Sequence, residues 1–315
     1  MTPVLRIRDL TVEFATDFGV SKAVRGVSFD VQRGQVTAIV GESGSGKSVT
    51  AGAVMRLIQP PGRVTGGSVQ FASGSGEPFE ILDLAEGDPR LYELRGGHIS
   101  LVFQEPMTAL SPVHRVGAQV AEAISCHRRV TRRAAWQEAV EMLGRVGIPD
   151  AARRARMYPF QFSGGMRQRV MIAMALVCGP ELLICDEPTT ALDVTVQAEI
   201  LTLIRELQSG LGNSVLFITH DLGVVAQVAD HVVVMYQGRV LEIGTVRQVL
   251  KDPVHPYTRG LLAAIPGTGR PGERLLTIAK VVGNADLTTP QPLIRLADGR
   301  QVSLPPGYAP ERGLG

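Results

Sequence analysis

The sequence has few cysteines, few aromatic residues and no long apolar run, and these shortages exclude several classes of protein. Its 315 residues include 3 cysteines, Cys126, Cys178 and Cys185, and none of them forms a CxxC pair. That spacing excludes a disulfide framework and a cysteine-rich metal site, and it fits a reducing compartment. No stretch of about 18 uncharged apolar residues occurs, so we expect no membrane-spanning helix.

An excess of charge of one sign is also lacking. There are 32 Lys and Arg against 30 Asp and Glu, which gives a net charge of +2. The bulk charge therefore does not favour nucleic acid or anionic lipid as a partner. Two arginine clusters, at 128–133 and 153–156, leave a nucleic-acid face open as an alternative. A solvated helical face, or contact with phospholipid head groups or a partner loop, is the favoured interpretation.

Short apolar strands and helical patterns alternate through most of the chain. Val36–Val40 is β-branched and uncharged, which is typical of a strand buried on both faces. Leu182–Cys185 and Val215–Thr219 are further apolar strands, each followed by helical spacing. This alternation predicts an α/β fold with a mostly parallel sheet and helices on both faces.

Two regions depart from that alternation. From about 106 to 162 the spacing is helical without a convincing strand, which predicts a helical insert. Beyond Gly267 the chain is rich in Pro and Gly. There, residues 293–296 and 301–304 flank Asp298-Gly299, which favours a β-hairpin. We therefore expect one α/β domain over 1–266, with the insert inside it, and a C-terminal extension over 267–315.

A glycine-rich loop follows the strand Val36–Val40. Residues 41–48, GESGSGKS, match G-x-x-x-x-G-K-[ST] and precede a helix predicted from Lys47 to about Ile58. In such a loop, backbone amides and the helix N-terminus bind phosphate. Lys47 is then expected near the β- and γ-phosphates, and the Ser48 hydroxyl on Mg²⁺.

Two carboxylates end another apolar strand. Asp186 and Glu187 follow Leu182–Cys185 directly. In an open α/β sheet the ligand lies beyond the carboxyl ends of the strands. Asp186 is therefore placed to hold Mg²⁺, and Glu187 to orient or deprotonate the attacking water.

A further motif identifies the family. Residues 162–169, FSGGMRQR, resemble the LSGGQ-type signature of ATP-binding cassette (ABC) ATPases, with Phe for the first Leu and Met for the Gln. Gln104 resembles the Q-loop glutamine, residues 191–193 the D-loop, and His220 the switch histidine. The resemblance covers about 5 to 266. It implies a P-loop cassette with an antiparallel N-terminal β subdomain, in which two ATPase subunits meet head to tail.

The resemblance implies a site shared between two such subunits. Phe18 is similar in placement to the aromatic that stacks on adenine; Phe14 is its rival, and a core aromatic is the alternative for either. Expected catalytic residues are Glu187, His220 and Gln104, and expected Mg²⁺ ligands are Ser48, Gln104 and Asp186. Residues expected to bind ATP are Phe18, Gly41, Glu42, Ser43, Gly44, Ser45, Gly46, Lys47, Ser48, Val49, Ser163, Gly164, Gly165 and Asp193.

Three segments narrow the resemblance within the family. Residues 104–112, 163–172 and 255–266 resemble importers of the oligopeptide/dipeptide/nickel permease group. This implies a peripheral subunit on the cytoplasmic face of the plasma membrane. Its expected partners are a second ATPase (a paralogue or a copy), two membrane-spanning permeases and an extracytoplasmic binding protein. Many members end in a cysteine-rich tail, but residues 267–315 lack cysteine, so we expect no iron–sulfur cluster.

Other functions and other solutes compete with peptide import. A soluble ABC ATPase acting on DNA or ribosomes is the main alternative, although Lys47 and Ser163 are only 116 residues apart, too close for long coiled coils. A small-molecule kinase would leave the signature, Gln104 and His220 unexplained. Among solutes, peptide is the first expectation, with nickel, glutathione and opine-like compounds open.

Overall fold

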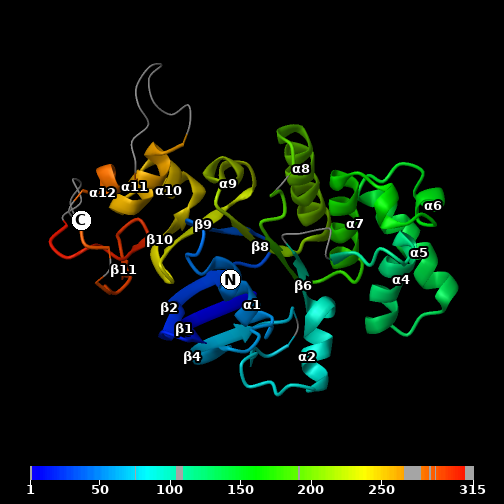
Figure 1. Cartoon of the computed structure of the whole chain (residues 1–315), viewed down its shortest axis with the longest axis horizontal. Coiled ribbons are helices and arrows are strands. Elements are labelled where there is room, and N and C mark those ends of the chain that lie inside the picture. The colour runs from blue at the N-terminus through cyan, green and yellow to red at the C-terminus, as the bar shows by residue number, and fades with distance from the viewer. Residues whose placement is uncertain are drawn as a thin grey trace. The chain divides into compact units, whose positions relative to one another are not determined.

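The structure of the protein is a computed structural model (Figure 1). It describes residues 2–74, 76–103, 109–190, 192–265, 278–283, 285–287 and 289–308. The chain forms two compact units, which are described separately. The first contains residues 1–4, 31–34 and 70–217, and the second contains 5–30, 35–69 and 218–315.

The first unit contains a parallel pair of buried strands. β6 (Ile99–Val102) pairs with β7 (Leu182–Asp186), with Ile99 opposite Leu182 and Val102 opposite Cys185. β8 (Ser214–Thr219), which begins in this unit, is the next strand beyond β7. All residues of β7 except Asp186 are buried, as expected for a strand covered on both faces.

Helices make up most of the rest of the first unit, and Figure 1 shows α4 to α7 grouped together. Residues 109–162, the described part of the expected insert, contain helices and no strand. The helical elements of the unit, in chain order, are α2 (Pro89–Glu93), η1 (Leu94–His98), α4 (Val116–His127), α5 (Arg132–Arg145), α6 (Ala151–Arg154), η2 (Pro159–Gln161), α7 (Gly164–Leu176) and α8 (Val194–Leu211).

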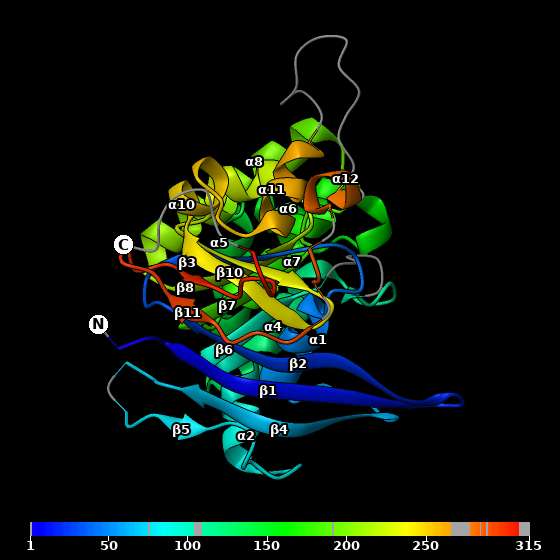
Figure 2. The same cartoon turned by 90° about the vertical axis from the view of Figure 1, so that its left-hand side faces the viewer.

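The second unit contains two groups of strands. In the first group β1 (Leu5–Thr16) lies between β2 (Gly19–Val31) and β4 (Gly62–Phe71), as Figure 2 shows. The turn at Asp17-Phe18 joins β1 to β2, so these two neighbours run antiparallel. The end of β4, in the first unit, pairs antiparallel with β5 (Phe79–Glu80).

The second group of strands joins the phosphate-loop strand to the tail. β3 (Val36–Val40) pairs in parallel with β9 (His231–Tyr236), and β9 pairs antiparallel with β10 (Arg239–Thr245). β12 (Gln301–Val302) adds to β10, and β11 (Ile294–Arg295) adds to β12, both antiparallel. The tail segments flanking Asp298-Gly299 therefore continue the strand order that begins at β3.

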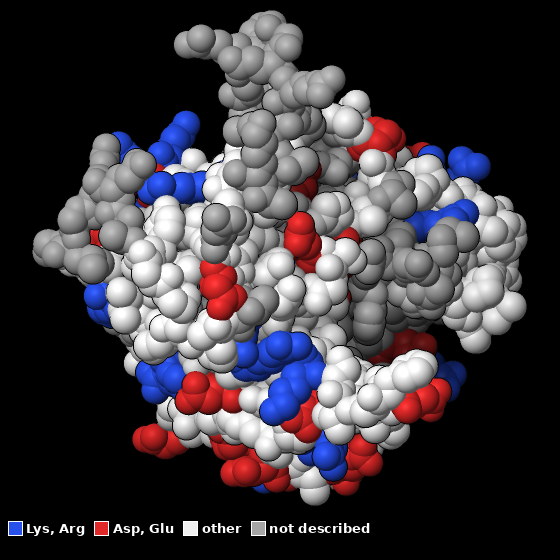
Figure 3. Space-filling view, turned by 60° about the vertical axis from the view of Figure 1, so that its left-hand side comes forward, with Lys and Arg blue, Asp and Glu red and all other residues white. Residues whose placement is uncertain are grey.

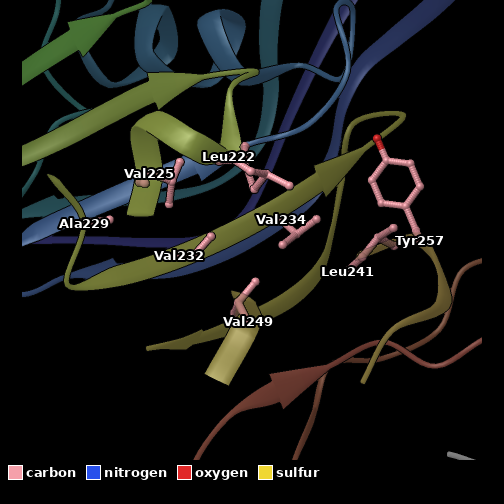
Figure 4. Close-up of a cluster of buried hydrophobic side chains, with 10 residues drawn as sticks. Leu222, Val225, Ala229, Val232, Val234, Leu241, Val249 and Tyr257 are labelled. Carbon is pink, nitrogen blue, oxygen red and sulfur yellow. The ribbon is translucent and has the colours of Figure 1, made fainter. Parts of the chain in front are cut away.

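Helices of the second unit pack on these strands. They are α1 (Lys47–Val54), α9 (Leu222–Val228), α10 (Val246–Lys251), α11 (Pro256–Ala263) and α12 (Ile278–Val282). A buried cluster joins β3, β9 and β10 to these helices through residues such as Val234, Leu241, Val249 and Tyr257 (Figure 4). Among the described residues, no helix combines the length and the apolarity needed to cross a bilayer.

Candidate functional site

The loop between β3 and α1 has a backbone that only glycine adopts at two places. Gly41 has φ 155° and Gly46 has φ 96°. A Cβ at Gly41 would lie 2.1 Å from the carbonyl oxygen of Met235, and one at Gly46 would lie 2.5 Å from that of Ala23. Both glycines therefore allow the loop to pass against neighbouring backbone, whereas a Cβ at Gly44 would meet nothing within 4 Å.

Lys47 is held inside this loop. Its side chain is 4% exposed, and Nζ donates hydrogen bonds of 2.8 Å to the carbonyl oxygens of Gly41 and Glu42. The loop thus encloses an ammonium group, while Glu42 and Ser43 lie exposed. A buried cation beside exposed loop residues at a helix N-terminus is a setting suited to phosphate.

The residues at the start of α1 fit a magnesium ion that is bound mainly by phosphate and water. Ser48 is exposed and Val49 is half-buried. The Ser48 hydroxyl is the kind of hard oxygen ligand that Mg²⁺ prefers. In the described part of the chain, no group of three or more His, Cys, Asp or Glu side chains could hold a metal.

His220 also belongs to the second unit and follows β8 in an exposed bend. The next residue fixes this bend: the Asp221 amide donates to Thr219 Oγ1 at 3.0 Å. The Asp221 carboxylate in turn caps α9 by accepting from the Gly223 amide at 2.7 Å. The sequence thus places an exposed imidazole on a short, well-braced turn.

The two acidic residues at the end of β7 belong to the first unit. Asp186 is the last residue of the strand, and Glu187 follows it with φ 46°. A left-handed backbone at a non-glycine residue costs about 1–3 kcal/mol and occurs preferentially at functional sites. The Thr190 hydroxyl donates to Glu187 Oε2 at 3.0 Å, which fixes the direction of the carboxylate.

The signature segment opens α7 in the first unit. Ser163 is the N-cap, and its Oγ accepts from the Met166 amide at 3.3 Å. Ser163 and Gly164 are exposed. A Cβ at Gly165 would lie 2.5 Å from Val196 Cγ1, so this glycine lets α7 approach α8 closely. The segment therefore presents a helix N-terminus with a free approach to its backbone.

The neighbouring residues explain two other features of this segment. Phe162, which stands where the signature usually has Leu, is 4% exposed and packs in the interior. Asp193 is the N-cap of α8, and its Oδ1 accepts from the Val196 amide at 3.0 Å. Asp193 and the signature thus lie at the starts of two helices that contact each other.

The two candidate adenine aromatics have different surroundings. Phe18 is fully exposed in the turn between β1 and β2. Phe14 is partly buried, and its ring lies against Gly62: a Cβ there would come within 2.5 Å of Phe14 Cε1. Two other predicted positions, Gln104 and Ala191 of the D-loop, lie outside the described residues.

Sequence reasoning missed two residues that touch the predicted ones. Thr190 binds the Glu187 carboxylate, as described above. Tyr257, on α11, is fully buried, and its hydroxyl accepts a hydrogen bond of 3.4 Å from the Glu42 amide of the glycine-rich loop. The signal available for Tyr257 was its place in the segment 255–266, which was used only to assign the subgroup.

The predicted residues fall into two sets. The loop 41–48 and His220 belong to the second unit, and Asp186, Glu187, Ser163 and Asp193 belong to the first. A buried strand, a glycine-rich loop closed around a lysine and a helix that starts at that lysine together define a P-loop nucleoside-triphosphatase.

Comparison with known proteins gives the family. The family model "ABC transporter" matches residues 24–190, and "Oligopeptide/dipeptide transporter, C-terminal region" matches 241–288. The chain is 49% identical over 292 residues to the oligopeptide transport ATP-binding protein OppD of Bacillus subtilis (strain 168), a match that covers 92% of this chain and 79% of that relative. It is 50% identical over 296 residues to OppD of Escherichia coli (strain K12), covering 94% and 83%.

Solved structures agree with these sequence matches. The dimeric structure of MJ0796, a bacterial ABC transporter cassette, is 26% identical, has a TM-score of 0.67 and covers 77% of this chain and 99% of that one. CbiO1 from Clostridium perfringens, part of the ABC transporter complex cbiONQ, is 28% identical, with a TM-score of 0.67 and coverage of 80% and 92%.

The chain belongs to the ABC transporter family, in its group of oligopeptide/dipeptide ATP-binding proteins. It is an ABC-type ATPase. The predicted family and fold class are confirmed, and none of these matches supports the alternative of a soluble ATPase acting on DNA or ribosomes.

Proposed function

We propose that this chain hydrolyses ATP to power the import of peptides through a membrane permease. The observation that carries the proposal is the enclosed ammonium of Lys47 in a chain half identical to oligopeptide transport ATP-binding proteins. The loop supplies the nucleotide site, and the relatives' names supply the solute. Nickel, glutathione and opine-like compounds remain the competing solutes.

The glycine-rich loop binds the phosphates in this proposal. Lys47 contacts the β- and γ-phosphates, and backbone amides of the segment 43–48 other than that of Ser45 surround them, with Val49 following at the start of α1. Mg²⁺, when bound, neutralises charge on the phosphates. Ser48, Asp186 and Gln104 are its proposed protein ligands.

Hydrolysis depends on residues that act on the attacking water. Glu187 orients or deprotonates this water, and its hydrogen bond from Thr190 supports a fixed carboxylate. His220 contacts the γ-phosphate from its exposed bend. Gln104 reaches both the ion and the water, and it joins the core to the helical insert.

Two ATPase subunits close head to tail on the nucleotides. Ser163, Gly164 and Gly165 of one subunit donate to the γ-phosphate held by Lys47 of the other, and Asp193 lies beside that contact. The exposed backbone at the start of α7 supports this role. Losing the γ-phosphate removes the contacts that hold the pair closed, so hydrolysis becomes motion.

The remaining assignments concern adenine, the domains and the partners. We assign Phe18 to adenine because it is fully exposed, with Phe14 as the alternative. The ATPase domain spans 1–266, its insert at about 106–162 passes motion to the permease, and 267–315 is an extension. The partners are a second ATPase, two permeases and a binding protein, at the cytoplasmic face of the membrane.

Nucleic acid is not among the proposed partners. On the face in Figure 3, basic and acidic side chains of the described residues are interspersed over the surface. The net charge of +2 agrees with this mixture. A protein that binds the phosphate backbone of nucleic acid normally gathers its positive charge on one face.

The proposal is tested with the transporter that copurifies with this chain, reconstituted in lipid vesicles with its binding protein. ATP hydrolysis is measured with a mixture of oligopeptides, with nickel and with glutathione. We expect stimulation by peptides alone. Stimulation by nickel or glutathione instead would contradict the peptide assignment, and a complex without membrane partners would contradict the transport role.

A further inference from the structure

Tyr257 is a core residue with a polar atom at the phosphate loop. Its side chain is fully buried in the cluster of Val234, Leu241 and Val249, where Figure 4 shows it pointing its oxygen away from the other labelled side chains. The ring also packs on Tyr236, with centroids 4.6 Å apart. A phenylalanine would give the same packing, so the hydroxyl needs a separate explanation.

The hydroxyl contacts one of the two peptide groups that hold Lys47. The Glu42 amide donates to Tyr257 Oη at 3.4 Å, and the Gly41 carbonyl accepts from Lys47 Nζ at 2.8 Å. These two groups belong to a single planar trans peptide, so they point in opposite directions. Tyr257 therefore holds that peptide at its amide, and Lys47 holds it at its carbonyl.

The phenol is protonated under ordinary conditions, and so it can donate as well as accept. Burial raises the pKa of Tyr257 well above its usual value. Because Gly41, at φ 155°, offers little steric resistance to rotation, the contact with Tyr257 helps to fix the orientation of the peptide.

Hydrogen bonds anchor the start of α11, the helix that carries Tyr257. His255 Nδ1 caps the helix by accepting from the Tyr257 amide at 3.0 Å. The buried carboxylate of Glu242, on β10, accepts from the amides of Val254 and His255 at 2.9 and 3.1 Å. The backbone on both sides of the helix start is thereby fixed to the strands.

The C-terminal hairpin completes this anchor. Arg300, between β11 and β12, is 6% exposed and has Nη1 3.8 Å from Glu242 Oε1. It also donates to the Asp252 carbonyl at 2.5 Å and to the Asp298 carboxylate at 2.6 Å. The tail therefore places a guanidinium beside the buried carboxylate of Glu242.

We propose that Tyr257 is a positioning residue for the phosphate loop and fixes the Gly41–Glu42 peptide that holds Lys47. This inference depends on the proposed role of the loop in binding ATP. Through Glu242 and Arg300, the C-terminal region stabilises the start of α11 and thereby the position of Tyr257 at the loop. The region thus contributes to ATP binding without touching the nucleotide.

The test compares two variants of the full chain that each lose one hydroxyl. Tyr257→Phe removes the contact with Glu42, and Tyr236→Phe is the matched control, since its hydroxyl accepts from Gln237 Nε2 at 3.0 Å. We expect Tyr257→Phe to weaken ATP binding about three- to fivefold, the size of one modest hydrogen bond, with an unchanged melting temperature. Tyr236→Phe should bind ATP as the parent does.

Equal affinity of the parent and Tyr257→Phe would overturn the inference. Absence of ATP binding by the parent would instead contradict the proposed function, so the two failures are distinguishable. If Tyr257→Phe has a lower melting temperature than the parent, hydrogen exchange of the Glu42 amide in the parent tests the assignment instead. There we expect a protected Glu42 amide, and exchange at the rate of an unstructured peptide would overturn the assignment.

Discussion

At the scale of single residues, the site depends on a lysine enclosed by its own loop. Lys47 is buried and donates to two loop carbonyls, which requires the backbone conformations of Gly41 and Gly46. A buried ammonium is stable only when its hydrogen bonds are made. The carbonyl oxygens of Gly41 and Glu42 therefore face inward to Lys47, which agrees with the proposed role of the loop in binding phosphate.

Replacing Lys47 by alanine is expected to weaken ATP binding at least about tenfold, because a hydrogen bond to a charged group is lost. Calorimetry with the full chain gives the affinity. Lys22→Ala is the matched control, since Lys22 lies on β2 in an exposed ion pair with Glu13 at 3.2 Å. Affinity equal to that of the parent would remove Lys47 from the nucleotide site.

Motif spacing predicts some of the candidate site residues but not all of them. The loop 41–48, Asp186 and Glu187 are local patterns, each tied to one strand and the turn after it. Thr190 and Tyr257 are not predictable in this way. Thr190 becomes a partner of Glu187 only through the left-handed turn at φ 46°, and Tyr257 reaches Glu42 across 215 residues of sequence.

At the scale of elements, the sequence predicts that the helices exist but not where each of them ends. The helix predicted from Lys47 to about Ile58 ends at Val54, because Arg56 adopts φ 54° and the Leu57 amide turns back to the Gly52 carbonyl at 2.8 Å. Such an end usually has glycine, which the sequence lacks there. The start of α7 at Gly164 is fixed by Ser163, which caps the helix.

The start of α11 gives a prediction about pH. Burial lowers the pKa of His255 to about 4, below its ordinary value of 6.5. Between these values the unfolded chain takes up a proton that the native chain does not, so the free energy of unfolding falls as the pH falls. The loss amounts to at most about 3 kcal/mol at pH 4.

His255→Asn keeps a capping side chain but removes the titration. We expect the melting temperature of the variant to lie furthest below that of the parent at pH 7, and the gap to narrow toward pH 4. The pKa of Glu242, raised by burial, acts in the opposite sense in both proteins. A gap that stays constant across the range would show that His255 does not remain neutral in the native chain.

At the scale of the whole molecule, the sequence predicts the α/β class because its apolar strands and helices are each continuous in the chain. Val36–Val40 and Leu182–Asp186 are recognisable from their own residues. The pairing of the tail with β10 is different. It joins Glu242 to Val302 and Ile243 to Gln301, and local propensity carries no information about such a distant partner.

We propose that ATP binding and ATP hydrolysis depend on separate groups of residues in this chain. In this proposal ATP binding depends on the loop around Lys47, and Tyr257 positions that loop. In the same proposal hydrolysis depends on Glu187, whose carboxylate accepts a hydrogen bond from Thr190. The family assignment makes the chain an ABC-type ATPase, and the proposed coupling to peptide import requires that both steps take place in the assembled transporter.

The most direct test is a single-turnover measurement of ATP hydrolysis by the reconstituted transporter, with the parent chain and with Glu187→Gln. The variant keeps the size and the hydrogen-bonding capacity of the side chain but removes the carboxylate. The account predicts that ATP affinity stays within about twofold while hydrolysis falls about 100-fold or more, the usual contribution of a general base. Hydrolysis at the parental rate in Glu187→Gln would contradict it.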